Sequence, residues 1–219
     1  MVKVDQKAKS WGIFVAFNEL SGIRNGYPEF EREISEFERE YSKGDLEGLK
    51  DDPVVRAYRD FYWRIGIDPT KTRPAGEALR RRLIRDGKLP RISFIVDVGN
   101  MVSAKTLVPI GIYDRKKFVE EPVITISEGG EEFLGIGKKK VERVQPGVPI
   151  MLSGKAVMHI YPHRDSLLTS VDDKTTDVLV VCAGVPGVPE SLVKQACDEV
   201  KDLLVNYGSA QVVKDTQIA

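Results

Sequence analysis

The sequence has few of the residues from which proteins build metal sites and disulfide frameworks. Among its 219 residues are two cysteines and two histidines. Cys182, Cys197, His159 and His163 contain no Cys-x-x-Cys pair, and their spacing does not fit a four-ligand zinc site. The two histidines lie four residues apart on a segment expected to be extended, so they share no helical face. We therefore expect neither a metal nor another cofactor.

Long apolar runs and a surplus of charge of either sign are also missing. No apolar stretch approaches the roughly 20 residues that span a bilayer, and the first residues lack the apolar stretch of a signal peptide. The 33 basic and 33 acidic side chains cancel, whereas proteins that bind duplex nucleic acid without specificity are clearly basic. These absences predict a soluble, cytoplasmic protein without a membrane partner, in which any contact with nucleic acid uses a local patch.

The charges that cancel over the whole chain are separated along it. Residues 29–52 carry ten acidic and four basic side chains, whereas residues 71–91 carry eight basic and two acidic ones. A helix expected over residues 74–85 therefore offers a phosphate-binding surface. Its alternative interpretation is a solvated face, partly neutralised by an acidic helix over residues 28–42. The candidate RNA-binding residues are Arg80, Arg81, Arg85 and Lys88.

Apolar patterns divide the chain into a helical first part and a mixed second part, which predicts the α+β class. We expect three parts: an N-terminal strand and helical extension over residues 1–54, a main domain over 55–208, and a flexible tail over 209–219. Pro28 suits the first position of the acidic helix. Further helices are expected over 53–65 and 189–207, and strands over 11–17, 92–96, 108–113, 123–127, 132–136, 148–152, 156–161 and 177–185.

One candidate site follows the strand expected over residues 92–96. Asp97 is a good helix cap, and Gly99 would let a ligand approach the backbone closely. Asn100 carries both a donor and an acceptor, so it can orient a water molecule. The pattern predicts a turn whose free backbone N–H groups hold an anion, a carbonyl or a water. The alternative is a simple Asp cap with Asn100 facing solvent.

A second polar cluster follows the strand expected over residues 156–161. Arg164 is suited to hold a phosphate or carboxylate, and Asp165 to pair with an ammonium group. Ser166 and Thr169 supply hydroxyl groups for a ribose or a water. The alternative is an Asp or Ser cap on a short turn with an exposed arginine, because polar clusters at strand ends are common.

Three separated blocks of the sequence resemble one known family. They are IGIDPTKTRPAGEALRRRL, LPRISFIVDVGNMVSAKTLVPIGIYD and HRDSLLTSVDDKTTDVLVVCAGV. Together they resemble the tRNA-editing (B3/B4) domain of the phenylalanyl-tRNA synthetase β subunit, and most of all the free-standing relatives of that domain. The resemblance covers roughly residues 55–205. It implies a helical N-terminal part packed on a mixed β body of the B3/B4 type, closed by a C-terminal helix.

The resemblance also implies an activity and site residues. In the synthetase, this domain hydrolyses tyrosine wrongly attached to the tRNA for phenylalanine. By position, Asp97 and Asn100 fall on the family's V-D-x-x-N motif, and Asp114 on the aspartate that closes its P-x-x-x-[FY]-D segment. The block from Tyr161 to Thr169 would line the opposite wall of the pocket. This chain has Gly111 and Val181 where the synthetase domains often place a histidine and a glutamate.

The leading functional hypothesis is a free-standing aminoacyl-tRNA deacylase that protects translation fidelity in trans. Asn100, Asp165 and Thr169 are its expected catalytic residues; Asp97, Gly99, Asp114, Arg164 and Ser166 would bind substrate. The partner is the acceptor end of an aminoacylated tRNA. One alternative is a non-catalytic tRNA- or RNA-binding module. Another is a protein that binds an amino acid or another small molecule, which the absence of net charge favours.

Overall fold

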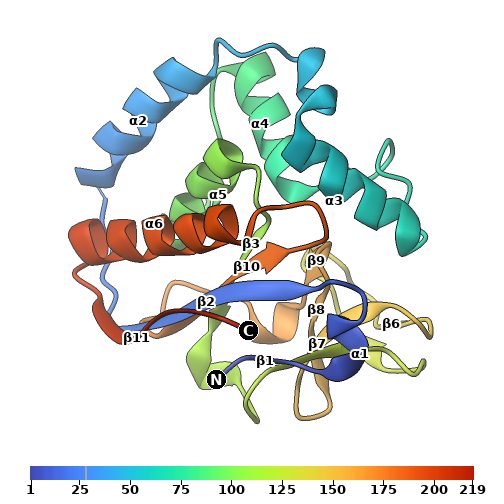
Figure 1. Ribbon diagram of the computed structural model, residues 1–219. Coiled ribbons are helices and arrows are strands. Elements are labelled where there is room, and N and C mark those ends of the chain that lie inside the picture. The colour runs from blue at the N-terminus through green and yellow to red at the C-terminus, as the bar shows by residue number, and fades with distance from the viewer. Residues whose placement is uncertain (28) are drawn as a thin grey trace.

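Helices and strands form the mixed α+β arrangement that the sequence predicts (Figure 1). The computed structural model describes residues 1–27 and 29–219. Pro28, the expected first residue of the acidic helix, lies outside the described residues, and that helix, α2, is described over Glu29–Tyr41. None of the helices in the described part of the chain has the length and apolar character needed to cross a bilayer.

A four-stranded antiparallel sheet with the order β11-β2-β10-β3 forms the centre of the structure. Helices α5 and α6 cover one of its faces (Figure 1). Every residue of β10 is buried, because this strand has a partner on each side. The elements span Phe14–Ser21 (β2), Ile110–Asp114 (β3), Val178–Gly184 (β10), Gln211–Ile218 (β11), Phe94–Thr106 (α5) and Glu190–Gly208 (α6).

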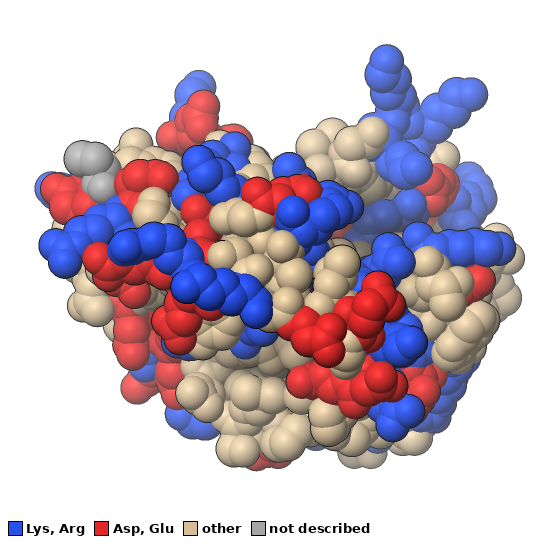
Figure 2. Space-filling model, turned by 90° about the horizontal axis from the view of Figure 1, so that it is seen from above, with Lys and Arg blue, Asp and Glu red and all other residues tan. Residues whose placement is uncertain are grey.

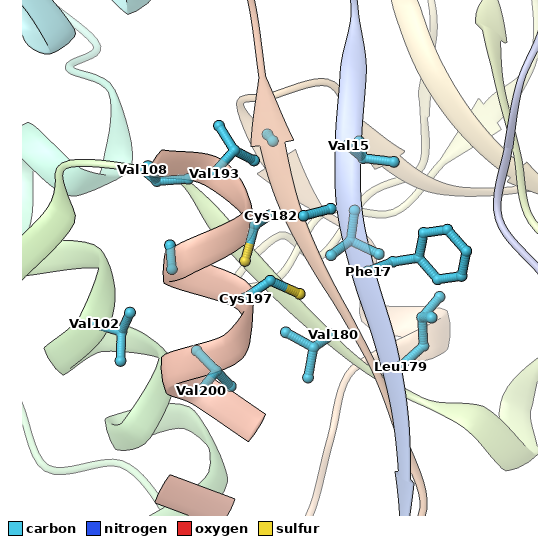
Figure 3. Packing of buried hydrophobic residues seen from close by; sticks show 14 of the residues in the cluster. Val15, Phe17, Val102, Val108, Leu179, Val180, Cys182, Val193, Cys197 and Val200 are labelled. Carbon is cyan, nitrogen blue, oxygen red and sulfur yellow. The ribbon is translucent and has the colours of Figure 1, made fainter. Parts of the chain in front are cut away.

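Apolar side chains leave both faces of this sheet, as the alternation along a strand requires. Figure 3 shows Val180 and Cys182 of β10 pointing toward Cys197 and the rest of α6, whereas Phe17 of β2 points to the opposite side. Both cysteines are free and buried. Burial raises the pKa of the Cys182 thiol, next to Cys197, so Cys182 is a structural thiol rather than a nucleophile.

A second, five-stranded sheet has the order β1-β4-β7-β8-β9. It faces the central sheet on the side away from α6, where the buried Tyr161 donates a hydrogen bond to the carbonyl of Gly184 at 2.7 Å. A short ribbon of β5 and β6 lies beside it. These strands span Lys3–Val4 (β1), Val123–Ile126 (β4), Glu132–Phe133 (β5), Glu142–Arg143 (β6), Pro149–Ser153 (β7), Ala156–Ile160 (β8) and Arg164–Asp165 (β9).

Helices α3 and α4 begin and end within one residue of the bounds that the sequence predicts. Asp52 caps α3 (Pro53–Arg64) by accepting from the N–H of Val54 at 2.8 Å, a side-chain cap that satisfies one of the free donors of a helix start. Helix α4 (Ala75–Asp86) ends at Gly87, whose φ of 73° is the left-handed conformation that glycine favours. Helix α1 (Gln6–Lys9) is a single turn.

The strand expected over residues 92–96 is wrong, because this segment opens helix α5. Ser93, not Asp97, is the N-cap residue. The apolar run is ambiguous in the sequence because α5 packs against α4, α6 and β3, and a helix buried on most sides shows no amphipathic period. Asp97 therefore lies inside the first turns of a helix rather than at a strand-to-helix turn.

The flexible tail expected over residues 209–219 is also wrong. Residues 211–218 form β11, which pairs with β2, and the backbones of Val15 and Ala219 exchange two hydrogen bonds of 3.1 and 3.0 Å. The apolar pattern does not reveal this strand because it is the exposed edge of the sheet and so carries many polar residues. Since β2 lies between β11 and β10, the N-terminal segment and the tail share a sheet with the expected main domain.

Candidate functional site

The hairpin of β8 and β9 places a histidine directly opposite an aspartate. His159 and Asp165 are partners in the register of the two strands. The Nδ1 atom of His159 lies 2.8 Å from Oδ1 of Asp165. A carboxylate accepts only, so Nδ1 carries the hydrogen, which leaves Nε2 as an acceptor when the ring is neutral. An imidazole oriented in this way by a carboxylate is suited to accept a proton from water.

A tyrosine from the central sheet completes the cluster. The hydroxyl of Tyr113, on β3, donates to the same Oδ1 of Asp165 at 2.7 Å, and its ring meets that of His159 edge-on at 6.3 Å between centroids. Burial, and secondarily Asp165, raise the pKa of Tyr113 far above its usual value. The hydroxyl therefore stays protonated and donates. The cluster thus joins the two sheets through one carboxylate oxygen.

These three side chains line a cavity of about 50 Å³ between the sheets. Its polar wall is completed by His163, which packs edge-on against Tyr62 at 5.8 Å. Burial lowers the pKa of His163 to about 4, and the charge of Arg164 contributes, so this imidazole is neutral at pH 7. The remaining lining residues are mainly apolar: Ala75, Pro109, Ile110, Gly111, Met151, Tyr161, Pro162, Val181 and Ala183.

Of the predicted cluster over residues 161–169, four residues line the cavity, namely Tyr161, Pro162, His163 and Asp165, whereas Arg164, Ser166 and Thr169 do not. The guanidinium of Arg164 lies 5.0 Å from the ring of Phe133 and pairs with Glu142. Adjacent residues of a strand point to opposite faces, which separates Arg164 from Asp165. Ser166 caps the 3-10 turn Leu167–Thr169 by accepting from the N–H of Leu168 at 3.1 Å. Thr169 is buried in that turn.

The residues predicted around Asp97 do not join this cavity. The buried carboxylate of Asp97 accepts from the N–H of Ile92 at 2.9 Å and from the hydroxyl of Tyr27, and burial raises its pKa. A Cβ on Gly99 would lie 3.0 Å from Ile112, so this glycine serves the packing of α5 on β3. Asn100 is half-buried within α5 and is not among the cavity-lining residues.

Asp114, the last predicted ligand-binding residue, stabilises the end of β3. Its carboxylate accepts from the N–H of Lys116 at 3.0 Å and from the hydroxyl of Thr175 at 2.8 Å. The residue is buried and is not among those lining the cavity. Among the described residues, no three His, Cys, Asp or Glu side chains are grouped so that they could hold a metal ion.

The four predicted RNA-binding residues divide into structural and exposed groups. Arg80 donates to the carbonyls of Ala104 and Lys105 at 2.6 and 2.8 Å, at the end of α5. Arg81 donates to the carbonyl of Leu46 at 2.9 Å. These two arginines hold elements together. Arg85 pairs with its neighbour Asp86 on the surface, and Lys88 is exposed.

A basic groove of about 340 Å³ lies along α4 and the loop before it. The residues that line it are Lys71, Arg73, Ala78, Arg81, Arg82 and Arg85. Figure 2 shows this uneven charge from above: basic side chains project at the upper right, whereas acidic and basic ones mix at the left, where α2 lies. The groove and the cavity adjoin the same stretch of chain at the start of α4. Ala75 lines the cavity, whereas Arg73 and Ala78, two and three residues away, line the groove.

Two residues of the cavity, His159 and Tyr113, are missing from the site that the sequence predicts, whereas His163 lies within the predicted segment over residues 161–169. The polar segment around Pro162 is a tight hairpin, and pairing its two arms about that proline would have placed His159 opposite Asp165. Tyr113 approaches from another sheet, 52 residues away from Asp165 in the chain. No local pattern indicates that contact.

Comparisons with known proteins agree with this architecture. The chain is 25% identical to the phenylalanine–tRNA ligase β subunit of Chlorobaculum tepidum over 123 residues, which are 56% of this chain and 15% of that protein. Its fold resembles the crystal structure of an N-terminal fragment of the phenylalanyl-tRNA synthetase β subunit from Pyrococcus horikoshii, with a TM-score of 0.58 and 12% identity. That likeness covers 97% of this chain and half of the fragment.

The structural likeness reaches beyond the part recognised in the sequence, because 97% coverage includes most of the first 54 residues. A sequence model of the B3/4 domain matches residues 57–209. That range contains the β8–β9 hairpin, Tyr113 and the basic groove along α4. The chain therefore belongs to the B3/4 domain family, to which the three sequence blocks point.

Proposed function

We propose that this protein hydrolyses, in trans, the ester that joins an amino acid to the terminal ribose of a mischarged tRNA. The observation that carries this proposal is the hydrogen-bonded set of Tyr113, His159 and Asp165 in a cavity of a B3/4 domain. An aminoacyl ester is already activated, so its hydrolysis needs mainly a positioned water, a proton acceptor and an oriented substrate.

The cavity supplies these elements as follows. Nε2 of His159 accepts a proton from the attacking water while the water oxygen bonds to the ester carbonyl carbon. Asp165 stabilises the imidazolium that forms, as a carboxylate does for a catalytic histidine. The same proton then passes to the departing ribose oxygen, which leaves free amino acid and deacylated tRNA. Oδ2 of Asp165, which accepts neither the Tyr113 nor the His159 hydrogen bond, is available to the substrate's α-ammonium group.

The basic groove gives the RNA a route to this cavity. Phosphates attract the lysine and arginines of the groove in a salt-dependent way, and the first turn of α4 separates the groove from the cavity. An acceptor end lying along α4 would therefore bring its terminal ribose to Ala75. The overall absence of net charge fits a protein that holds RNA at one local patch.

The first experiment removes the proton acceptor and its carboxylate partner. A pool of tRNAs mischarged with different amino acids is mixed with the wild-type protein, Asp165→Asn and His159→Gln, and the remaining ester is measured over time. We expect each variant to be about 10²–10⁴-fold slower, the usual contribution of a general base. Asp202→Asn, an exposed aspartate on α6, is the matched control. Wild-type protein that leaves every ester as stable as buffer does would refute the proposed activity.

A second candidate function is a tRNA-binding module without turnover. Its support is that Gly111 and Val181, the positions where the synthetase domains often place a histidine and a glutamate, both line the cavity. Salt-sensitive tRNA binding by a wild-type protein that hydrolyses no ester would favour this function. A protein that binds only a free amino acid would shift no tRNA in a gel at low salt.

A further inference from the structure

The cavity beside His159 and Asp165 is too small for an aromatic side chain. Its volume is about 50 Å³, whereas a buried cavity that takes up a benzene molecule measures about 150 Å³. A water molecule needs about 10–15 Å³ of such space. The cavity therefore has room for a water and a small group, but not for an aromatic ring.

Tyr113 sets this limit from one side. The residue is 1% exposed, and its hydroxyl donates a hydrogen bond to Asp165 at 2.7 Å. Tyr113 and Gly111 project toward the same face of β3, because they are two residues apart on one strand. A Cβ built on Gly111 would lie only 2.2 Å from the Tyr113 hydroxyl oxygen. The tip of the tyrosine thus fills the space that a side chain at position 111 would use.

Beside Tyr113, the wall formed by the central sheet has the chemistry of a site for a small apolar group. Val181 and Ala183 lie on β10, which pairs with β3 so that Val181 is opposite Gly111, and Pro109 and Ala75 complete this wall. A substrate whose ammonium group binds Asp165 would direct a short side chain to these residues. A polar end and an apolar end in one cavity fix the orientation of a ligand.

We infer that the protein acts on tRNA esters of amino acids whose side chain is no larger than a methyl or hydroxymethyl group, namely glycine, alanine and serine, and that Tyr113 excludes the aromatic ones. This inference rests on the proposed hydrolytic function. It makes Tyr113 a specificity-determining residue, whose ring occupies space that the ring of a larger substrate would need.

The test charges one pool of total tRNA non-selectively with each amino acid in turn, so that the RNA is the same throughout. Wild-type protein is then compared on the glycine, alanine, serine, tyrosine and phenylalanine esters. We expect the alanine ester to be hydrolysed at least about 100-fold faster than the tyrosine ester, which is within the discrimination that pocket size supplies. Equal or faster hydrolysis of the tyrosine ester would overturn the inference and leave the proposed function intact. Stability of all five esters would overturn the inference, and the proposed function as well only if the esters of every other amino acid were also stable.

Two variants test the role of Tyr113 itself. Tyr113→Ala enlarges the cavity and should raise the tyrosine-to-alanine rate ratio about tenfold or more, toward the less selective behaviour of an open pocket. Tyr113→Phe, the matched control, keeps the ring and should keep the ratio within about threefold of wild type, whatever it does to the absolute rate. A ratio that stays unchanged in a folded Tyr113→Ala protein would assign the selectivity to another group. If that variant does not fold, the wild-type comparison alone decides the inference.

Discussion

His163 shows how single residues of the cavity are held in one protonation state. It lies in the turn of the β8–β9 hairpin, with its ring packed against Tyr62, and burial depresses its pKa from 6.5 to about 4. The unfolded chain therefore binds a proton between about pH 6.5 and 4 that the folded protein does not. Unfolding is favoured as the pH falls through this window, so the contribution of His163 to stability is present above about pH 6.5 and is lost on acidification.

This linkage predicts a measurable difference between the wild type and His163→Gln. Between pH 7 and pH 5 the free energy of unfolding of the wild type should fall by about 1 kcal/mol more than that of the variant, a value reduced because the partly exposed ring is screened by water. Urea unfolding at both pH values measures it. The other titrating groups are common to both proteins and cancel in the comparison. Identical pH dependence in the two proteins would show that His163 is not held neutral.

The contrast between Asp165 and Arg164 shows which features of a site can be predicted from residue types and which cannot. Both belong to one polar segment, and the residue types are sufficient to mark that segment as a candidate site. The alternation of a strand sends the two side chains to different surroundings: Asp165 to His159, Arg164 to Phe133. Which of the two faces the cavity depends on the register of β8 and β9, and a one-residue shift would exchange them.

Among the elements, helices α3, α4 and α6 and the strands β3, β4, β5, β7, β8 and β10 follow from local patterns, whereas α5 and β11 do not. A helix buried between other elements has no polar face to reveal its period. An edge strand whose side chains are mostly exposed has no apolar stripe. Both are recognised only through their neighbours. The cavity is hidden in the sequence for a similar reason, since its walls come from β3, β7, β8, β9, β10 and the start of α4.

Removing β11 tests whether it is an integral strand of the sheet, because a loose tail could be removed without loss of stability. A chain that ends at Ala210 lacks the pairing with β2 and the hydrogen bond of Asn18 with Thr216 at 3.2 Å, and it exposes the edge of a buried strand. We expect the free energy of unfolding to fall by at least about 2 kcal/mol, as when other buried hydrogen-bonded networks are broken, and aggregation to increase.

Urea unfolding and light scattering check this expectation. Val213→Thr, at an exposed position of β11, is the control and should change the free energy of unfolding by no more than about 0.5 kcal/mol. If the shortened chain were as stable as the wild type, residues 211–218 would contribute nothing to the sheet, and the tail expected from the sequence would be the better description.

At the scale of the whole molecule, the net charge of zero results from acidic and basic segments that are separated along the chain. In the fold, part of these charges form ion pairs with one another. Arg91 of the basic segment pairs with Glu31 and Glu38 of α2, and Arg59 and Arg81 approach the buried Glu77. These pairs remove several charges from any surface role. The basic side chains left most open to water in the groove are Lys71, Arg82 and Arg85, at 83%, 52% and 67% exposure.

Neutralising two of these exposed side chains tests whether the groove holds RNA. The double variant Arg82→Gln and Arg85→Gln leaves the structural Arg80 and Arg81 in place. It should weaken tRNA binding at low salt and reduce the slope of log affinity against log salt by about 1 for each phosphate that is no longer neutralised. Lys9→Gln, on the distant α1, is the control of equal chemistry and should leave the slope unchanged. Equal slopes in all three proteins would show that the RNA binds elsewhere on the protein. The slope counts the phosphates that the protein neutralises, so the loss of two contacting arginines must change it.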